Sequence, residues 1–287
     1  MATGATEFID NTTADAFIPE HWSKKAQIAR EQQLFFANVF DRQYESELEA
    51  GDILNVTPVG NLTAQTKSAN TAIVYETETP TNIQITVNVN EYSAFALETK
   101  TKKQSHMDLA KKYAPKQGYA CGLAIDDVGA GLPDDFGTSP QGVLGTPTSY
   151  SDWLRAQQAL DDALVPLKGR FMGISPAERK NLMEMDQFIH ADFSKLQDAT
   201  APPAVTEAKI GTWMNMPVYM STNIEGSNAA GHDNFMAHKE ALALIVQIDM
   251  PSYYFFDIDY FAHKYAVETL YGWKEMRDDH GCFVRGA

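Results

Sequence analysis

The sequence predicts an α+β protein, and three stretches lead to this fold class. Residues 104–132 have the length and pattern of one long helix. Residues 83–90 alternate between apolar and polar side chains, as a half-buried strand does. Residues 151–189 read as a helix, a strand and a second helix. Together they indicate a mixed protein in which a hairpin precedes the long helix and a globular half follows it.

The long helix has an unusual face. Ser105 and Asp108 match a capping box at its start. Small residues then recur at every fourth position, which would let another backbone approach: Ala110, Ala114, Gly118 and Gly122. Pro115 should cost up to ~3 kcal/mol of helix stability, so tertiary packing must hold the segment. The stretch fits a spine across a flat protein, or alternatively a core helix kinked at the proline.

Two segments precede the hairpin. Residues 1–20 are small, polar and acidic, which predicts a flexible arm that is ordered only by a partner surface. Residues 23–50 have the spacing of a helix that ends at Gly51, with one apolar face: Phe36, Phe40, Tyr44 and Leu48.

Residues 51–90 predict a long hairpin. Short strand-like runs at 53–57 and 72–75 flank a tip, residues 58–71, that is too polar to pack on its own core. A projecting two-stranded hairpin is marginal alone, so we expect it to lie on a neighbouring subunit. An ordinary surface hairpin in a β-rich domain fits this stretch equally well.

The hairpin region and the start of the long helix carry charges of opposite sign. The hairpin region is acidic at Glu76, Glu78, Glu91 and Glu98, and six lysines lie at positions 100, 102, 103, 111, 112 and 116. Opposite charges on two long elements could steer subunits together, although exposed ion pairs contribute only ~0–1 kcal/mol each. The alternative is a solvated lysine face.

The second half begins after a connector rich in Pro, Gly and Ser at residues 133–149. Trp153, Leu160 and Leu164 outline a helix that ends before Val165, and residues 170–174 read as a buried strand. Ser175-Pro176-Ala177-Glu178 is a strong helix start, and the helix continues through Ile189. Further strands are expected near 213–220 and 282–284, with a loop at 201–208 and a mobile loop at 221–234. Periodicity does not decide between helix and strand for 241–248 and 260–271.

The composition argues against several classes of protein. A formal charge of −15 and a pI near 4.8 argue against binding phosphate backbones over the whole surface. The first 23 residues hold no Lys, Arg or long apolar run, so we expect no signal peptide, and no run is long enough for a membrane span. The two cysteines, Cys121 and Cys282, have no metal or redox spacing and are expected to be reduced.

No common catalytic motif is present, including the nucleophile elbow, the zinc-protease helix and the nucleotide-binding loops. The best cation candidate is Asp257, Asp259 and His263, which could share one face of a strand. Polar positions on the outer face of an aromatic strand are the simpler interpretation. His232-Asp233 and His280 read as surface residues, and Cys121 as a small buried one.

Several phrases, in this order, resemble the major capsid protein of tailed double-stranded-DNA bacteriophages, the Hong Kong ninety-seven type of capsid fold. They are FIPEHWS, YESELEAGDILNVTPVG, QSHMDLAKKYA, LDDALVPLKGRFMGISPAERKNLM and LYGWKEMRDDHGCFVRG. The resemblance implies an N-terminal arm and first helix (1–50), an extended hairpin loop (51–92), a peripheral domain with the spine helix (93–133 and 235–287) and an α/β axial domain (134–234).

The resemblance also implies a structural, non-enzymatic function without cofactors. Pentamers and hexamers of the chain would form the icosahedral head that encloses double-stranded DNA, assembled in the host bacterial cytoplasm. Partners would be the chain itself, a portal, and scaffolding or decoration proteins. The alternatives are an encapsulin-like compartment shell and an α/β enzyme. The expected assembly interface comprises Asn61, Leu62, Lys67, Glu76, Glu78, Lys102 and Lys103.

Overall fold

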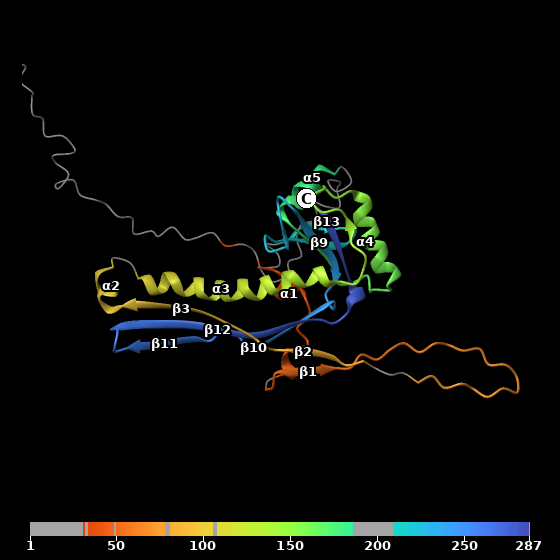
Figure 1. Ribbon diagram of the computed structural model, residues 1–287, viewed down its shortest axis with the longest axis horizontal. Helices are drawn as coiled ribbons and strands as arrows, with labels where there is room; N and C mark the ends of the chain where they lie inside the picture. The colour runs from red at the N-terminus through yellow and green to blue at the C-terminus, as the bar shows by residue number, and fades with distance from the viewer. Residues whose placement is uncertain are drawn as a thin grey trace, which may run out of the picture.

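The computed structural model describes residues 31, 34–48, 50–77, 81–105, 108–185 and 209–286. The predicted arm at 1–20, residue Ile189 and the loop at 201–208 lie outside these residues. Figure 1 shows an elongated molecule in which the helix α3 (Leu109–Gly131) lies along a flat sheet. A globular half sits at one end of α3, and a loop projects from the body beyond the short strands β1 (Ile53–Val56) and β2 (Ile83–Thr86).

The flat sheet is built around β12 (Ala262–Glu275). One edge of β12 pairs with β3 (Val89–Glu98), and the other pairs first with β11 (Ser252–Asp257) and then with β10 (Leu242–Ile248). All three pairings are antiparallel. The two segments whose state periodicity left open, 241–248 and 260–271, are therefore both largely strand.

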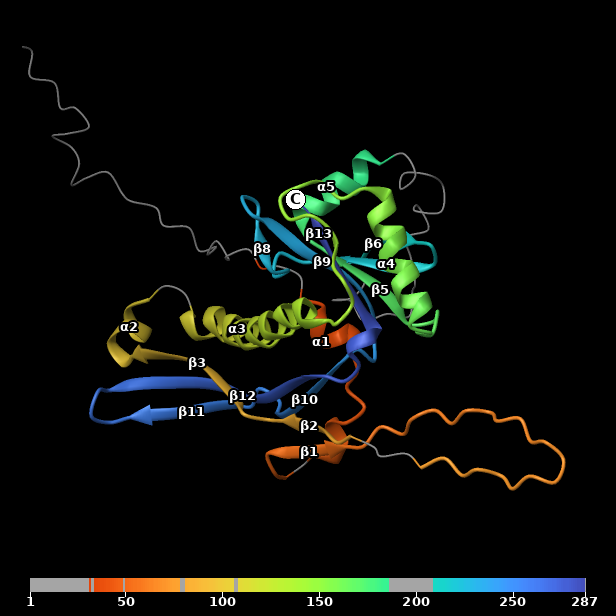
Figure 2. The same ribbon diagram turned by 45° about the vertical axis from the view of Figure 1, so that its right-hand side comes forward.

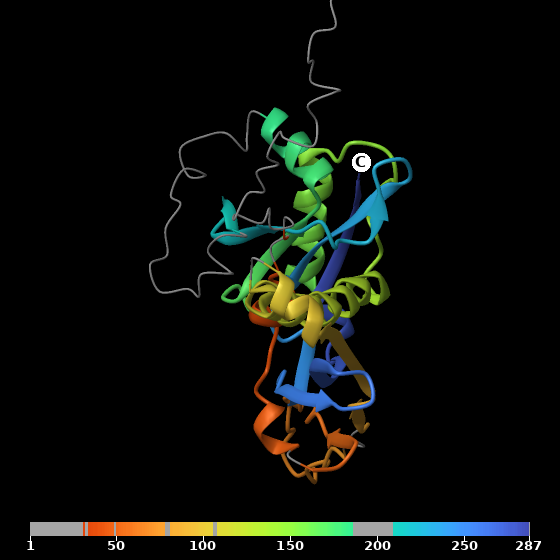
Figure 3. The same ribbon diagram turned by 90° about the vertical axis from the view of Figure 1, so that its left-hand side faces the viewer.

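α3 lies on one face of this sheet, as the view along the helix in Figure 3 shows. Gln117 Nε2 donates to the carbonyl oxygens of Ser93 (2.8 Å) and Tyr265 (3.2 Å), so one side chain joins the helix to two strands. Trp273 Nε1 donates to the Ile125 carbonyl at 2.9 Å. A Cβ on Gly129 would lie 2.7 Å from the Trp273 ring, so this close approach requires glycine.

The predicted long helix is confirmed over 109–131, with Pro115 inside it, but its start was predicted wrongly. Residues 99–104 form a separate helix, α2 (Thr99–Gln104), and the Ser105 N–H donates to the Thr101 carbonyl at its end. Asp108 caps α3, accepting from the Lys111 N–H at 3.5 Å. Of the small-residue stripe, Gly122 is approached closely, since a Cβ there would lie 3.3 Å from Leu34 Cδ1, whereas a Cβ on Gly118 would meet nothing within 4 Å.

The globular half contains a second, seven-stranded sheet (Figure 2). Its strands run in the order β4 (Gln141–Gly142), β13 (Gly281–Gly286), β9 (Gly231–His238), β5 (Arg170–Ile174), β7 (Met216–Met220) and β6 (Lys209–Trp213), with β8 (Gly226–Ser227) beside β9. The buried strand at 170–174 is confirmed, since all five of its residues are buried. The stretch predicted as one strand near 213–220 is instead a hairpin that turns at Met214 and Asn215.

Alternate residues of these strands supply two cores on the two faces of the sheet. One core contains Met172, Met236 and Val284 together with Trp153 and Leu160 of α4 (Tyr150–Asp162) and Leu182 of α5 (Pro176–Glu184). The Ser175 cap of α5 is confirmed, because its side chain accepts from the Glu178 N–H. Leu164 does not belong to this core; it lies beyond α4 and is 86% exposed.

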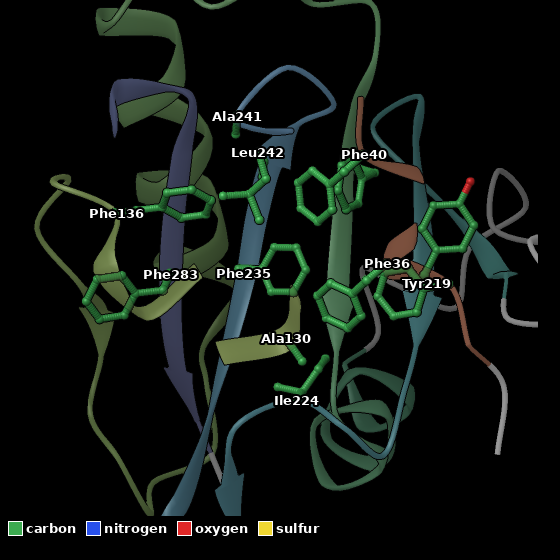
Figure 4. Close-up of a cluster of buried hydrophobic side chains, with 13 residues drawn as sticks. Phe36, Phe40, Ala130, Phe136, Tyr219, Ile224, Phe235, Ala241, Leu242 and Phe283 are labelled. Carbon is green, nitrogen blue, oxygen red and sulfur yellow. The ribbon is translucent and has the colours of Figure 1, made fainter. Parts of the chain in front are cut away.

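The other core is aromatic. Figure 4 shows Phe235 of β9 beside Phe36 and Phe40, with Tyr219 of β7 on one side and Phe283 of β13, next to Phe136, on the other. Phe36 lies in α1 (Phe36–Val39), which packs against α3. α1 therefore connects the aromatic core of the globular half to the long helix of the flat half.

The helix predicted over 23–50 is wrong across its described part. Only α1 and a short 3-10 turn, Glu45–Glu47, are helical between 34 and 48. Phe36 and Phe40 pack in the aromatic core, whereas Leu48 packs with Ile85 and Ile245 of the flat half. One face of a single helix could not reach both of these cores. The helix therefore ends before Phe40, which is extended, and Asp41 then forms a β-bridge with Ala243.

Other expectations also need correction. Residues 72–75 form no strand, the strand at 83–90 is divided between β2 and β3, and α5 ends at Glu184. Part of the expected mobile loop at 221–234 is β8 and the start of β9. The segment 235–287 does not form one unit with α3, because β9 and β13 lie in the seven-stranded sheet with β5.

A buried carboxylate joins three elements. Asp126 of α3 is 0% exposed and accepts from the Phe36 N–H at 2.8 Å and from Asn223 Nδ2 at 3.4 Å. Burial raises the pKa of Asp126 to about 7, and hydrogen bonds from the backbone of residues 35–37 and from Asn223 only partly oppose this. The site therefore favours the protonated carboxyl while using its oxygens as acceptors.

This balance makes a testable prediction about Asp126. The pKa of Asp126 in the folded protein lies above the ordinary value of 3.8. Between these two pKa values the folded protein keeps a proton that the unfolded chain has already released, and this stabilisation is lost as the pH rises through the folded pKa. Between pH 5 and pH 8 the wild type should therefore lose about 2–3 kcal/mol of unfolding free energy relative to Asp126→Asn. Urea unfolding at both pH values measures this, and an unchanged difference would contradict it.

Asp126→Ala separates hydrogen bonding from charge at the same position. It removes the acceptor of the Phe36 N–H, and a buried unpaired donor costs about 1–3 kcal/mol. We expect Asp126→Ala to lower the unfolding free energy at pH 5, where Asp126→Asn, whose amide oxygen still accepts, stays close to wild type. Equal losses in the two variants would contradict a role for the acceptor.

Candidate assembly surfaces

The extended loop is the first candidate surface. β1 and β2 pair antiparallel at its base, from Ile53 opposite Thr86 to Val56 opposite Ile83. Beyond this base, residues 57–77 contain no strand, and their side chains are exposed, including Val59 (92%) and Tyr75 (81%). Apolar side chains that face solvent in a projecting segment are typical of a contact surface.

One polar cluster ties the two sides of the loop together. The Glu76 carboxylate accepts from the Thr63 N–H at 2.9 Å, from the Thr63 hydroxyl and from Gln65 Nε2 at 3.0 Å. The Thr63 hydroxyl, followed by the Thr63 N–H and Gln65, lowers the pKa of Glu76. The Glu76 side chain thus connects the two sides of the loop, in a segment where no backbone hydrogen bonds between paired strands do so.

The predicted interface residues fall into two separate groups. Asn61, Leu62, Lys67 and Glu76 lie in the extended loop and are exposed. Lys102 and Lys103 are exposed on α2. Figure 1 shows α2 and the loop at opposite ends of the molecule, so a single subunit does not bring the two groups together. Glu78 lies outside the described residues.

A second apolar surface lies in the aromatic-rich C-terminal part of the chain, which the sequence indicated as a contact surface without showing where it lies in the fold. β11 forms an edge of the flat sheet, and the side chains along it are exposed on both faces: Tyr253 (50%), Tyr254 (58%), Phe255 (64%) and Phe256 (37%). The following turn adds Ile258, Tyr260 and Phe261, which are 66–72% exposed. An unbroken aromatic run was visible in the sequence, but only the sheet order places it at an edge.

The candidate cation site is not formed. Asp257 makes an ion pair with Lys264 at 2.5 Å, which lowers the pKa of Asp257. His263 Nδ1 shares a hydrogen bond with the Tyr254 hydroxyl at 2.6 Å. Because Asp257 pairs with Ala262 and Phe256 with His263, Asp257 and His263 point to opposite faces of the sheet. The described residues contain no cluster of His, Cys, Asp and Glu suited to a metal ion.

Two histidines predicted at the surface are buried. His232 (7% exposed) lies in β9, and the neighbouring Asp233 pairs with Arg285 of β13 at 3.2 Å. His280 (5% exposed) precedes β13, and its Nδ1 lies 2.9 Å from Asp279. Cys121 is buried as predicted, and burial raises the pKa of its thiol. None of the helices among the described residues is long and apolar enough to cross a membrane.

Known proteins were compared with this chain by sequence and by structure. No protein-family model matches, and no curated protein matches by sequence. Among solved structures, a chain from Mycobacterium phage Che8 is 19% identical with a TM-score of 0.75, covering 93% of this chain and 97% of that one. A chain from the capsid of the cyanophage P-SCSP1u is 14% identical with a TM-score of 0.73, covering 96% and 94%.

A chain from the capsid of Ralstonia phage GP4 is 13% identical with a TM-score of 0.64, covering 99% of this chain and 98% of that one. The likeness thus extends over nearly the whole of both chains and includes the long helix, the flat sheet and the globular half. This confirms the fold that the ordered sequence phrases suggested. The chain has the fold of the tailed-phage major capsid proteins, the Hong Kong ninety-seven type.

Proposed function

We propose that the chain is a structural subunit that assembles with copies of itself into the icosahedral head of a phage. The observation that carries this proposal is the shape of a single subunit: its projecting loop packs on no part of its own described core. Such a loop is marginally stable alone and is stabilised when it lies on a neighbour. Similarity of the whole fold to phage capsid chains supports the same conclusion.

The aromatic edge and the lysines of α2 add separate contact surfaces at the other end of the subunit. Because the two ends differ, contacts between them are head-to-tail, and such contacts generate closed rings when the rotation closes. Pentamers and hexamers are the rings proposed here. Many individually weak contacts can then hold a closed shell.

The four parts implied by the resemblance are proposed with one change. The segments 1–50, 51–92 and 93–133 keep their proposed roles as arm, extended loop and peripheral domain. The peripheral return is limited to β10, β11 and β12, because β9 and β13 share a sheet with β5 and β7. The axial domain then comprises most of 134–238 together with β13.

The proposed cargo is double-stranded DNA held without sequence-specific binding. A net charge of −15 disfavours tight binding to phosphates by counterion release, so packaged DNA would remain free to leave. A portal and, as further candidates, scaffolding and decoration proteins complete the proposed partners. The virion is the proposed location, after assembly in the host cytoplasm. An encapsulin-like compartment differs in its contents, so nucleic acid in purified particles favours a phage head.

Deleting the loop tip tests whether the loop joins subunits. Removal of residues 61–69 should leave the subunit folded, because these residues are exposed and contribute nothing to the described cores, yet shells should no longer form. Circular dichroism and electron microscopy of the same preparation measure both properties. A Gly/Ser segment of equal length in place of 61–69 controls for chain connectivity, and normal shells from the deletion would exclude an essential clamp.

Charge reversal tests the second group. Lys102→Glu together with Lys103→Glu should slow assembly, and adding salt should reduce the difference from wild type, because exposed charges act mainly on encounter. Light scattering during assembly measures the rate. The variant Lys102→Arg/Lys103→Arg keeps the charge and should behave as wild type. Unchanged kinetics in the Glu variant at low salt would remove these lysines from the interface.

Alanine at Asp257, Asp259 and His263 tests the enzyme alternative. A structural subunit should still form particles, since these groups are used in local contacts on an exposed hairpin. Metal content by mass spectrometry and particle formation by microscopy are compared with wild type. Loss of a stoichiometric metal in the variant would instead favour a metal-dependent protein.

A further inference from the structure

A groove lies on the globular half where four segments meet. The end of α1, the start of β5, the β6–β7 hairpin and the turn between β9 and β10 surround about 500 Å³. Its accessible lining includes the apolar side chains Val39, Leu167 and Pro217 and the polar Asn38, Lys168 and Lys239. An apolar floor with two cationic groups suits an acidic segment that also carries apolar side chains.

The walls of the groove are fixed from behind. Arg170 is turned inward, where its Nη1 lies 2.6 Å from Asp161 and its Nη2 donates to the Val165 carbonyl at 2.6 Å. The Lys239 N–H donates to the Gly169 carbonyl at 3.1 Å, and the Lys239 carbonyl accepts from the Asp41 N–H at 3.1 Å. The Lys168 carbonyl lies 2.9 Å from His238 Nε2. The backbone at both lysines is therefore held in place before any partner arrives, which reduces the entropic cost of binding.

The two lysines are available for a partner. Lys168 and Lys239 are exposed, and neither forms an ion pair with another residue in the described parts of the chain. The third cation of the groove, Arg170, is only 2% exposed at its side chain and is already paired with Asp161. The groove thus keeps an uncompensated positive charge on a chain whose formal charge is −15.

The N-terminal sequence has the complementary chemistry. Residues 1–23 carry four acidic side chains and no Lys or Arg: Glu7, Asp10, Asp15 and Glu20. Bulky apolar residues are interspersed with them, including Phe8, Phe17 and Trp22. The segment thus offers both the negative charges and the apolar side chains that suit the groove.

The described start of the chain leads away from the groove. Going back from Phe36, which is bonded to Asp126, Leu34 lies at Gly122 and Glu31 forms an ion pair with Lys116. These three points follow α3 towards its N-terminus over ten residues, or about 15 Å. The chain therefore leaves along α3 in the direction opposite to α1 and the groove, which favours a groove on another copy.

We propose that this groove binds the acidic segment 7–20 of a neighbouring copy of the chain, with its carboxylates at Lys168 and Lys239 and its aromatic side chains against Val39, Leu167 and Pro217. The contact is an interaction surface that does not depend on the shell being a phage head. It would operate equally in any oligomer of this chain, so it can fail while the proposed function stands.

The test uses a fluorescently labelled synthetic peptide of residues 1–23 and the purified full chain. We expect the peptide to bind, as measured by fluorescence anisotropy, with an affinity that falls as salt is added. The variant Lys168→Glu/Lys239→Glu should bind the peptide with an affinity at least about tenfold lower than that of the wild type. A peptide with Glu7→Gln, Asp10→Asn, Asp15→Asn and Glu20→Gln should also bind more weakly to the wild type.

The matched control is Arg155→Glu/Lys180→Glu, which makes the same change of charge on the exposed surfaces of α4 and α5. It should bind the peptide as the wild type does, and circular dichroism checks that both variants are folded. Two results overturn the proposal. Equal affinity for the groove variant and the wild type removes the groove as the site. No binding to the wild type removes the segment as its occupant.

Discussion

The flat half of the molecule depends on β12, because both edges of this strand are paired. Over 14 residues it joins β3 on one side and β11 and β10 in succession on the other. Every backbone group buried beneath α3 must have a partner, and a single long strand provides partners for three others at once. α3 is then fixed on this platform by Gln117 and by Trp273 against Gly129.

This constraint determines the shape of the subunit. A sheet of this length cannot be wrapped around a compact core, so its far end, with the aromatic edge of β11, remains exposed. The extended loop at the other end has the same character, since only the Glu76 cluster ties its two sides together. An isolated subunit therefore presents apolar surface at opposite ends, and association with further copies is the direct way to bury it.

The sequence predicted those parts of the fold in which local pattern and tertiary packing agree. The long helix, the β5 strand and the Ser175 cap follow from periodicity and capping chemistry that the structure keeps. The helix expected over 23–50 failed because Phe36 and Leu48, although spaced as on one helix face, are buried in different cores. The surface assignment of His280 failed because the neighbouring charges hid its position at the start of β13.

The candidate surfaces were only partly predictable for the same reason. The polar composition of residues 58–71 indicated a projecting loop, but the charged residues at its sides gave no sign that Glu76 would be bound by Thr63. The aromatic run at 253–256 was visible, yet exposure depends on sheet order, which pairs residues separated along the chain. The spacing of Asp257 and His263 predicts one shared face of a strand, whereas the pairing of β11 with β12 places them on opposite faces.

The central claim is that copies of this chain assemble with one another into a regular shell. Negative-stain electron microscopy of the material that sediments at high speed after expression of the chain alone tests it most directly. The account predicts shells, sheets or tubes built from regularly repeated subunits. Discrete monomers or small oligomers at every salt and protein concentration, with nothing regular in the pellet, would contradict it.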